Sequence, residues 1–114
     1  MAITKGNAIL RGVYGITQQE EQRIIDFLQG AVYCWCKNRK DEWFGVRDLM
    51  GGDNFYWEDT PLLPLFIKHQ NRGVKDPVDA AGKDCGWLLK KVIIMDKRNF
   101  ETEEIQLTRK YKWV

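Results

Sequence analysis

The spacing of apolar residues changes once along this chain, near residue 97. In the longest patterned stretches before that point they recur every three or four positions, which is the spacing of one helix face. After it they alternate with polar residues, which is the spacing of a half-buried strand. A chain with helices first and a strand pair last is expected to fold as an α+β domain. Its 114 residues match the common length of one domain, so we expect residues 1–114 to share a single core.

The first helix has the clearest start signal. Thr17-Gln-Gln-Glu20 has the spacing of a capping box, in which the Thr and Glu side chains each bond the other's backbone amide. Ile24 and Leu28 then begin an apolar row at helical spacing. The pattern predicts a long helix over 17–40, preceded by an N-terminal arm over 1–16.

Two further motifs place a capping side chain directly before a proline. Thr60-Pro61 and Asp76-Pro77 both have this form, and proline is favoured at the first helical position. We expect the helix that starts at Thr60-Pro61 to end at Asn71–Gly73 and the next helix to reach Val92. In each, apolar residues recur at helical spacing.

Shorter elements are predicted on either side of these helices. Trp43–Val46 is expected to form a short strand, Val46–Met50 a single helical turn, and residues 51–59 a polar, aromatic loop. Residues 98–102 and 108–114 alternate around a polar stretch at Glu103-Glu104, which predicts a C-terminal β-hairpin.

The order helix, strand, helix, helix and hairpin resembles that of a winged helix. The stretch Ala81-Gly-Lys-Asp-Cys-Gly-Trp-Leu-Leu-Lys-Lys-Val92 is similar to the third helix of such domains. Its two glycines, Gly82 and Gly86, predict the close approach of another backbone. Arg109-Lys-Tyr-Lys-Trp113 is similar to the closing wing strand in winged helices of phage and plasmid replication proteins. The resemblance covers residues 43–114 and implies a mainly helical, DNA-binding winged helix of phage or mobile-element origin.

The distribution of charge favours the same third of the chain. Residues 1–82 carry ten Lys or Arg and eleven Asp or Glu, whereas residues 83–114 carry eight and five, which leaves a basic excess there. Cations at phosphates release counterions and supply most non-specific affinity for double-stranded DNA. The residues expected to contact DNA are Lys83, Trp87, Lys90, Lys91, Lys97, Arg98, Arg109, Lys110 and Lys112. A solvated basic face is the alternative reading.

Metal binding and catalysis are not predicted. Cys34, Cys36, Cys85 and the only histidine, His69, lack the ligand spacing of a zinc site, and Cys34 and Cys36 point about 200° apart on a helix. We therefore expect no metal and no cofactor. We expect His69 to be a solvated or capping residue.

No catalytic residues are assigned. The chain contains no serine, which leaves no Ser/His pair. A set of acids could in principle gather around a divalent cation with Lys68, but such residues more often cap turns and helices. These acids are Asp48, Asp53, Glu58 and Asp59.

The alternative function is a protein-interaction module, as a homodimer or an adaptor. Phe55, Tyr56 and Trp57 are consecutive, so at least one is expected to be exposed or covered by a partner. The long first helix offers a second surface for a homodimer. The odd number of cysteines and the absence of a signal-peptide pattern or a long apolar span lead us to expect a cytoplasmic protein without a membrane partner.

Overall fold

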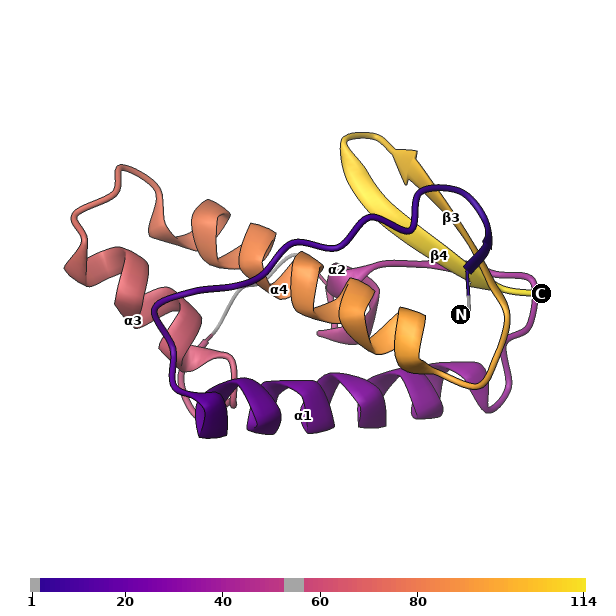
Figure 1. Ribbon diagram of the computed structural model, residues 1–114, viewed down its shortest axis with the longest axis horizontal. Coiled ribbons are helices and arrows are strands. Elements are labelled where there is room, and N and C mark those ends of the chain that lie inside the picture. The colour runs from indigo at the N-terminus through magenta and orange to yellow at the C-terminus, as the bar shows by residue number, and fades with distance from the viewer. Residues whose placement is uncertain (1–2, 53–56) are drawn as a thin grey trace.

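The computed structural model describes residues 3–52 and 57–114. Within those ranges the chain forms four helices and one mixed sheet of four strands, an α+β arrangement as predicted. The elements in chain order are β1 (Ile3–Lys5), α1 (Gln18–Cys36), β2 (Trp43–Phe44), α2 (Val46–Leu49), α3 (Leu63–Asn71), α4 (Pro77–Met95), β3 (Phe100–Ile105) and β4 (Thr108–Trp113). Helices α1 and α4 run along the length of the molecule, with α3 at one end and the sheet at the other (Figure 1).

Helix α1 begins where the capping box predicts. The Glu20 amide donates to Thr17 Oγ1 at 3.0 Å, and the Thr17 amide donates to Glu20 Oε1 at 2.8 Å. The helix ends at Cys36 rather than near Lys40. The polar residues that follow are exposed, and the chain reverses at Asp41, whose φ is 64° and whose amide donates to the Trp113 carbonyl at 2.9 Å. The helix therefore ends early, and the residues after it lie against strand β4 instead of continuing the helix.

The second proline motif is a helix cap, but the first is not. Asp76 accepts a hydrogen bond from the Asp79 amide at 3.0 Å, and α4 starts at the next residue, as predicted. The predicted start of α3 at Thr60-Pro61 was wrong. The Thr60 hydroxyl donates to the Trp57 carbonyl at 2.9 Å and accepts from the Leu62 amide at 3.2 Å. These bonds close a turn, and the helix begins only at Leu63.

The predicted hairpin is present, with its turn two residues beyond Glu103-Glu104. Those two acids belong to β3, where Glu103 pairs with Lys110 and Glu104 with Arg109. The turn is Gln106-Leu107, and both residues have left-handed backbone, with φ of 51° and 63°, as in a type I′ hairpin. The sheet order is β1-β3-β4-β2, with β1 parallel to β3 and β2 antiparallel to β4.

The core lies between the sheet and the helices. Phe44, Phe100 and Tyr111 come from β2, β3 and β4 and are all at most 1% exposed. The Phe44 ring centroid lies 6.2 Å from that of Phe100 and 6.1 Å from that of Tyr111, within the range of edge and tilted aromatic pairs. Leu28 of α1 and Leu89 of α4 extend the same cluster along the helices. One continuous core therefore joins the sheet to helices α1 and α4.

The glycines of α4 do not serve as a packing site. A Cβ added at Gly82 or Gly86 would meet no atom within 4 Å, so the predicted close approach of another backbone was wrong. Both glycines instead line an open groove. In the part of the chain that the structure describes, no helix is long and apolar enough to cross a membrane.

Candidate nucleic-acid interface

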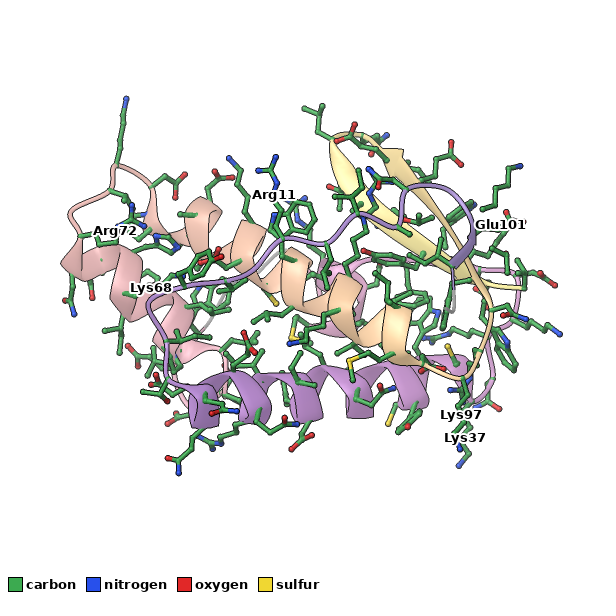
Figure 2. All side chains as sticks on the ribbon, in the orientation of Figure 1. Arg11, Lys37, Lys68, Arg72, Lys97 and Glu101 are labelled. Carbon is green, nitrogen blue, oxygen red and sulfur yellow. The ribbon has the colours of Figure 1, made fainter. Side chains whose placement is uncertain are left out.

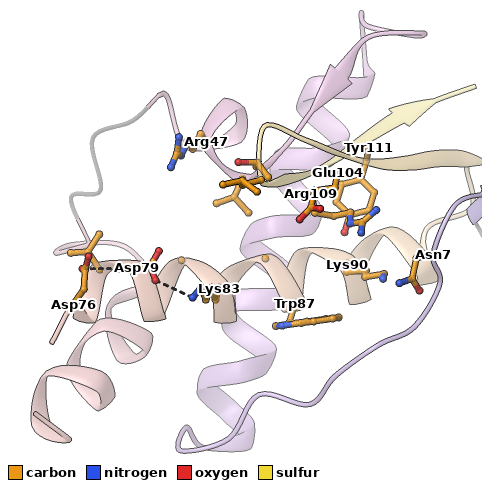
Figure 3. Close-up of a pocket in the computed structure, with 16 residues that line it drawn as sticks. Asn7, Arg47, Asp76, Asp79, Lys83, Trp87, Lys90, Glu104, Arg109 and Tyr111 are labelled. Atoms are coloured by element: carbon orange, nitrogen blue, oxygen red, sulfur yellow. Dashed lines mark hydrogen bonds and ion pairs between the residues drawn. The ribbon is translucent and has the colours of Figure 1, made fainter. Parts of the chain in front are cut away.

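A groove of about 560 Å³ separates α4 from the β3–β4 hairpin. Figure 3 shows α4 along one side and the strand that carries Arg109 and Tyr111 along the other. The α4 side is formed at helical spacing by Asp79, Lys83, Trp87 and Lys90. We call this feature the α4–hairpin groove. A volume of this size is typical of small-molecule and cofactor sites.

The cations of the groove differ in how far they are neutralised. Lys83 is exposed and forms an ion pair with Asp79 at 3.2 Å, one helical turn away. Exposed pairs of this kind contribute little to stability, so Lys83 remains available to an anionic ligand. Lys90 and Arg109 have no ion pair within residues 3–52 and 57–114. They are the cations that a ligand would meet without displacing an internal partner.

Lys90 is buried, which differs from the outward position predicted for it. Only 3% of it is exposed, and its Nζ lies 5.4 Å from the centre of the Trp87 ring. Burial, and then the neighbouring Arg109 guanidinium, lower the pKa of the Lys90 ammonium. The position on the helix was predicted correctly, but the side chain is buried in the folded protein.

Tyr111 forms the sheet side of the groove beside Arg109. It is 1% exposed, and its hydroxyl is buried without a hydrogen-bond partner among the described residues. Burial raises the pKa of this hydroxyl, against a smaller opposing effect of Arg109. Glu104 lies directly across the hairpin from Arg109 in the strand register, and it also lines the groove.

Five of the residues predicted to contact DNA lie outside the groove. Lys91 reaches back to Glu21 of α1 at 3.3 Å, Lys110 pairs with Asp48 at 2.9 Å, and Lys112 pairs with Glu101 at 3.6 Å. Arg98 pairs with Asp96 at 3.2 Å and lies over the rings of Tyr33 and Trp113. Lys97 projects near the C-terminal end of α1 (Figure 2). The structure thus gathers Lys83, Trp87, Lys90 and Arg109 from the predicted set.

The arm adds residues that sequence reasoning missed. Asn7 lines the groove, and the Arg11 guanidinium lies 5.5 Å from the centre of the Trp87 ring. Figure 1 shows the arm crossing α4 on its way from β1 to α1. Arg47 of α2 also lines the groove. The arm has no regular spacing, so nothing in the sequence pointed to these contacts.

His69 is a buried connecting residue, so the prediction of a solvated or capping role was wrong. It is 7% exposed, and its Nε2 lies 2.7 Å from Asp84 Oδ2. Arg72 Nη1 lies 3.2 Å from His69 Nδ1, and since a guanidinium only donates, Nδ1 accepts and Nε2–H donates to Asp84. Lys68 Nζ is 2.7 Å from the same carboxylate and also donates to the Tyr14 carbonyl. This cluster fixes α3, α4 and the arm together.

The remaining candidates for chemistry are scattered. Cys34 is exposed, whereas Cys36 and Cys85 are buried, and burial raises the pKa of the Cys85 thiol to about 12. Asp48 bonds the Gly45 amide and Lys110. No group of three or more His, Cys, Asp or Glu side chains in the described ranges is placed to hold a metal ion.

The predicted aromatic partner surface is only partly within the described residues. Trp57 is 5% exposed and belongs to the core, so it is not part of an exposed surface. Phe55, Tyr56 and the acid Asp53 lie outside the described residues.

No family model, no curated protein and no solved structure matches this chain.

Proposed function

We propose that this chain is a small non-catalytic protein that binds double-stranded DNA through the α4–hairpin groove and its rim. The observation that carries the proposal is the meeting of Lys83, Lys90 and Arg109 with Trp87 in one groove. Two of these cations have no internal ion pair in the described part of the chain. An interface of this composition suits phosphate contacts, which dominate affinity for nucleic acids.

The connectivity supports a winged-helix reading of the fold. Helix α1, strand β2, helices α3 and α4, and the β3–β4 hairpin follow one another in the order of such domains. Strand β2 pairs with β4, and α4 and the hairpin line the two sides of one groove, which is compatible with a third helix beside a wing. Strand β1 and the single turn α2 are additions to that pattern. In this reading α4 enters a groove of the duplex and the hairpin follows its backbone.

The charge at the groove predicts weak, salt-sensitive binding without strong base preference. Its lining includes the cations Arg47, Lys83, Lys90 and Arg109, but also three acids. These acids are Asp76, Asp79 and Glu104. Lysine holds phosphate as a point charge and reads base edges poorly beside Arg or Asn. We therefore propose a sequence-tolerant interaction rather than recognition of one site.

Fluorescence anisotropy with a random-sequence duplex tests this function. Lys83→Ala with Arg109→Ala removes two cations from the groove and should weaken binding. The salt slope should fall by about 2, because each cation that neutralises a phosphate contributes about 1. Lys37→Ala with Lys40→Ala removes the same charge after the end of α1 and should leave the slope unchanged. Absence of binding at low salt with protein on the order of micromolar, or equal weakening in the two double variants, would overturn the proposal.

A protein-interaction module is the second candidate, favoured by the arm. Ile9, Leu10 and Tyr14 are 68%, 42% and 82% exposed, which is unusual for three large apolar side chains within six residues. Light scattering tests for a homodimer, and Ile9→Asp should dissociate it. The Tyr56→Ala variant tests the aromatic segment separately. A monomeric wild-type chain at all concentrations would remove the homodimer from consideration.

A further inference from the structure

Three side-chain donors that form no hydrogen bond or ion pair among the described residues line the α4–hairpin groove. Lys90 lies in the C-terminal half of α4 and lines the groove. Arg109 and Tyr111 are two residues apart in β4, so their side chains point to the same face of the strand, which also lines the groove. Figure 3 shows Lys90 on α4, and Arg109 and Tyr111 on the strand at the other side of the groove. Arg109 contributes to lowering the pKa of the Lys90 ammonium and opposes the raised pKa of the Tyr111 hydroxyl.

Lys90 and Tyr111 are buried and Arg109 is half-buried, and no acid in the described chain pairs with either cation. Lys90 is 3% exposed, its ammonium faces the Trp87 ring, and it lies beside a second cation instead of an acid. A buried hydroxyl is normally hydrogen-bonded. The Tyr111 hydroxyl has no such bond among the described residues. Glu104 is the acid nearest in strand register, yet it forms no ion pair with Arg109.

We propose that Lys90, Arg109 and Tyr111 form a binding seat for a single phosphate group. A guanidinium, an ammonium and a phenol together donate in several directions, which suits a tetrahedral oxyanion with three or four acceptor oxygens. Binding would give the Lys90 ammonium and the Arg109 guanidinium the anionic partner that they lack among the described residues. The seat shares its groove with the proposed DNA interface, but it does not require duplex binding.

The phosphate can belong to a free phosphomonoester or to the backbone of DNA, and the groove has room for either. About 560 Å³ accommodates a free phosphomonoester with its organic group, such as a nucleoside 5′-monophosphate. A backbone phosphodiester of DNA carries the same kind of acceptor oxygens and would reach the seat from the rim at Lys83. Trp87 is only half-buried and forms the wall between these two ends.

Calorimetric titration of the full chain at constant ionic strength tests the seat, with inorganic phosphate, adenosine 5′-monophosphate and a random duplex as separate probes. Saturable binding of at least one probe is expected. Lys90→Met and Arg109→Met should each weaken it on the order of tenfold, since a hydrogen bond to a charged group contributes that much. Tyr111→Phe should weaken it less, Lys90→Arg should restore it in part, and the matched control Lys37→Met should leave it unchanged.

The outcomes separate the seat from the proposed function. Lys90-dependent binding of the monophosphate without duplex binding supports the seat and overturns DNA binding. Lys90-dependent binding of the duplex alone supports the seat with the DNA backbone as its source. Duplex binding that survives Lys90→Met, or no saturable binding of any probe, overturns the seat. Circular dichroism checks that each variant is folded, and if Lys90→Met is not, Arg109→Met and Tyr111→Phe decide.

Discussion

Replacing Lys90 by Met should make the protein more stable while weakening its ligand binding. Met occupies a similar volume, so the buried stem of the side chain keeps its packing and only the ammonium is removed. Removing an ammonium that burial disfavours and that no acid pairs with relieves a desolvation cost, from which the missing cation–π interaction with Trp87 subtracts about 0.5–1 kcal/mol. We expect a net gain in the free energy of unfolding of about 1 kcal/mol, or about 4 °C in Tm.

The pH dependence of this gain has a definite sign. The folded-state pKa of Lys90 is lowered below its unfolded value by burial and by Arg109, so the charged form destabilises the native state. That penalty is present in full below the folded pKa and is relieved as pH rises through it towards the unfolded value. The advantage of Lys90→Met over wild type should therefore be largest at neutral pH and shrink in alkali. Other titrating groups, including Cys85 and Tyr111, are common to both proteins and cancel in the difference.

Urea unfolding followed by circular dichroism measures this difference directly. Lys37→Met removes a charge from an exposed position and should change stability by no more than about 0.5 kcal/mol. A Lys90→Met protein that is less stable than wild type at neutral pH would refute the reasoning. So would a gain that does not vary with pH, since the ammonium would then not be its cause.

Three further predictions concern the scaffold. Asp84→Ala should lower the free energy of unfolding by about 3 kcal/mol, because Lys68 and His69 each lose a carboxylate at 2.7 Å. The control Asp79→Ala removes an exposed ion pair and should change it by less than about 1 kcal/mol. Equal urea midpoints for the two variants would contradict this prediction. Asn-Gly in place of Gln106-Leu107 should raise thermal stability by about 1 kcal/mol, because both residues have positive φ, and an unchanged melting curve would show that the turn is unstrained. A thiol reagent at neutral pH should modify Cys34 rapidly and spare buried Cys36 and Cys85, whose thiol pKa values are raised; a fast reaction that survives Cys34→Ala would argue against that burial.

Local interactions explain which parts of the fold could be predicted. The Thr17 and Asp76 caps are bonds between residues three apart, so the sequence alone contains both partners. The alternation in β3 and β4 is similarly local. The turn at Gln106-Leu107 has no Gly or Asn to mark it, and its position follows from the pairing of Glu103 with Lys110 instead. The parallel pairing of β1 with β3 joins opposite ends of the chain and leaves no local signal.

The sequence predicts which face of α4 carries the site residues, but not which other residues surround them in the folded protein. Helical geometry predicted Lys83, Trp87, Lys90 and Lys91 on one face of α4; the first three line the groove, whereas Lys91 pairs with Glu21 of α1. Whether a lysine keeps its charge free depends on acids that are distant in sequence, as with Lys91, whose partner Glu21 is 70 residues away. The burial of Lys90 and of the Tyr111 hydroxyl is likewise a tertiary feature.

The most direct test of the DNA interface is a map of the residues that a duplex perturbs. Amide and indole resonances would be followed by NMR while a random-sequence duplex is added at low salt. We expect the largest shifts at Lys83, Trp87 and Lys90 of α4 and at Leu107 and Arg109 of the hairpin, with the outer face of α1 unaffected. Shifts confined to α1 or to the arm, or no shifts at all, would contradict the assignment of the α4–hairpin groove as the DNA-binding surface.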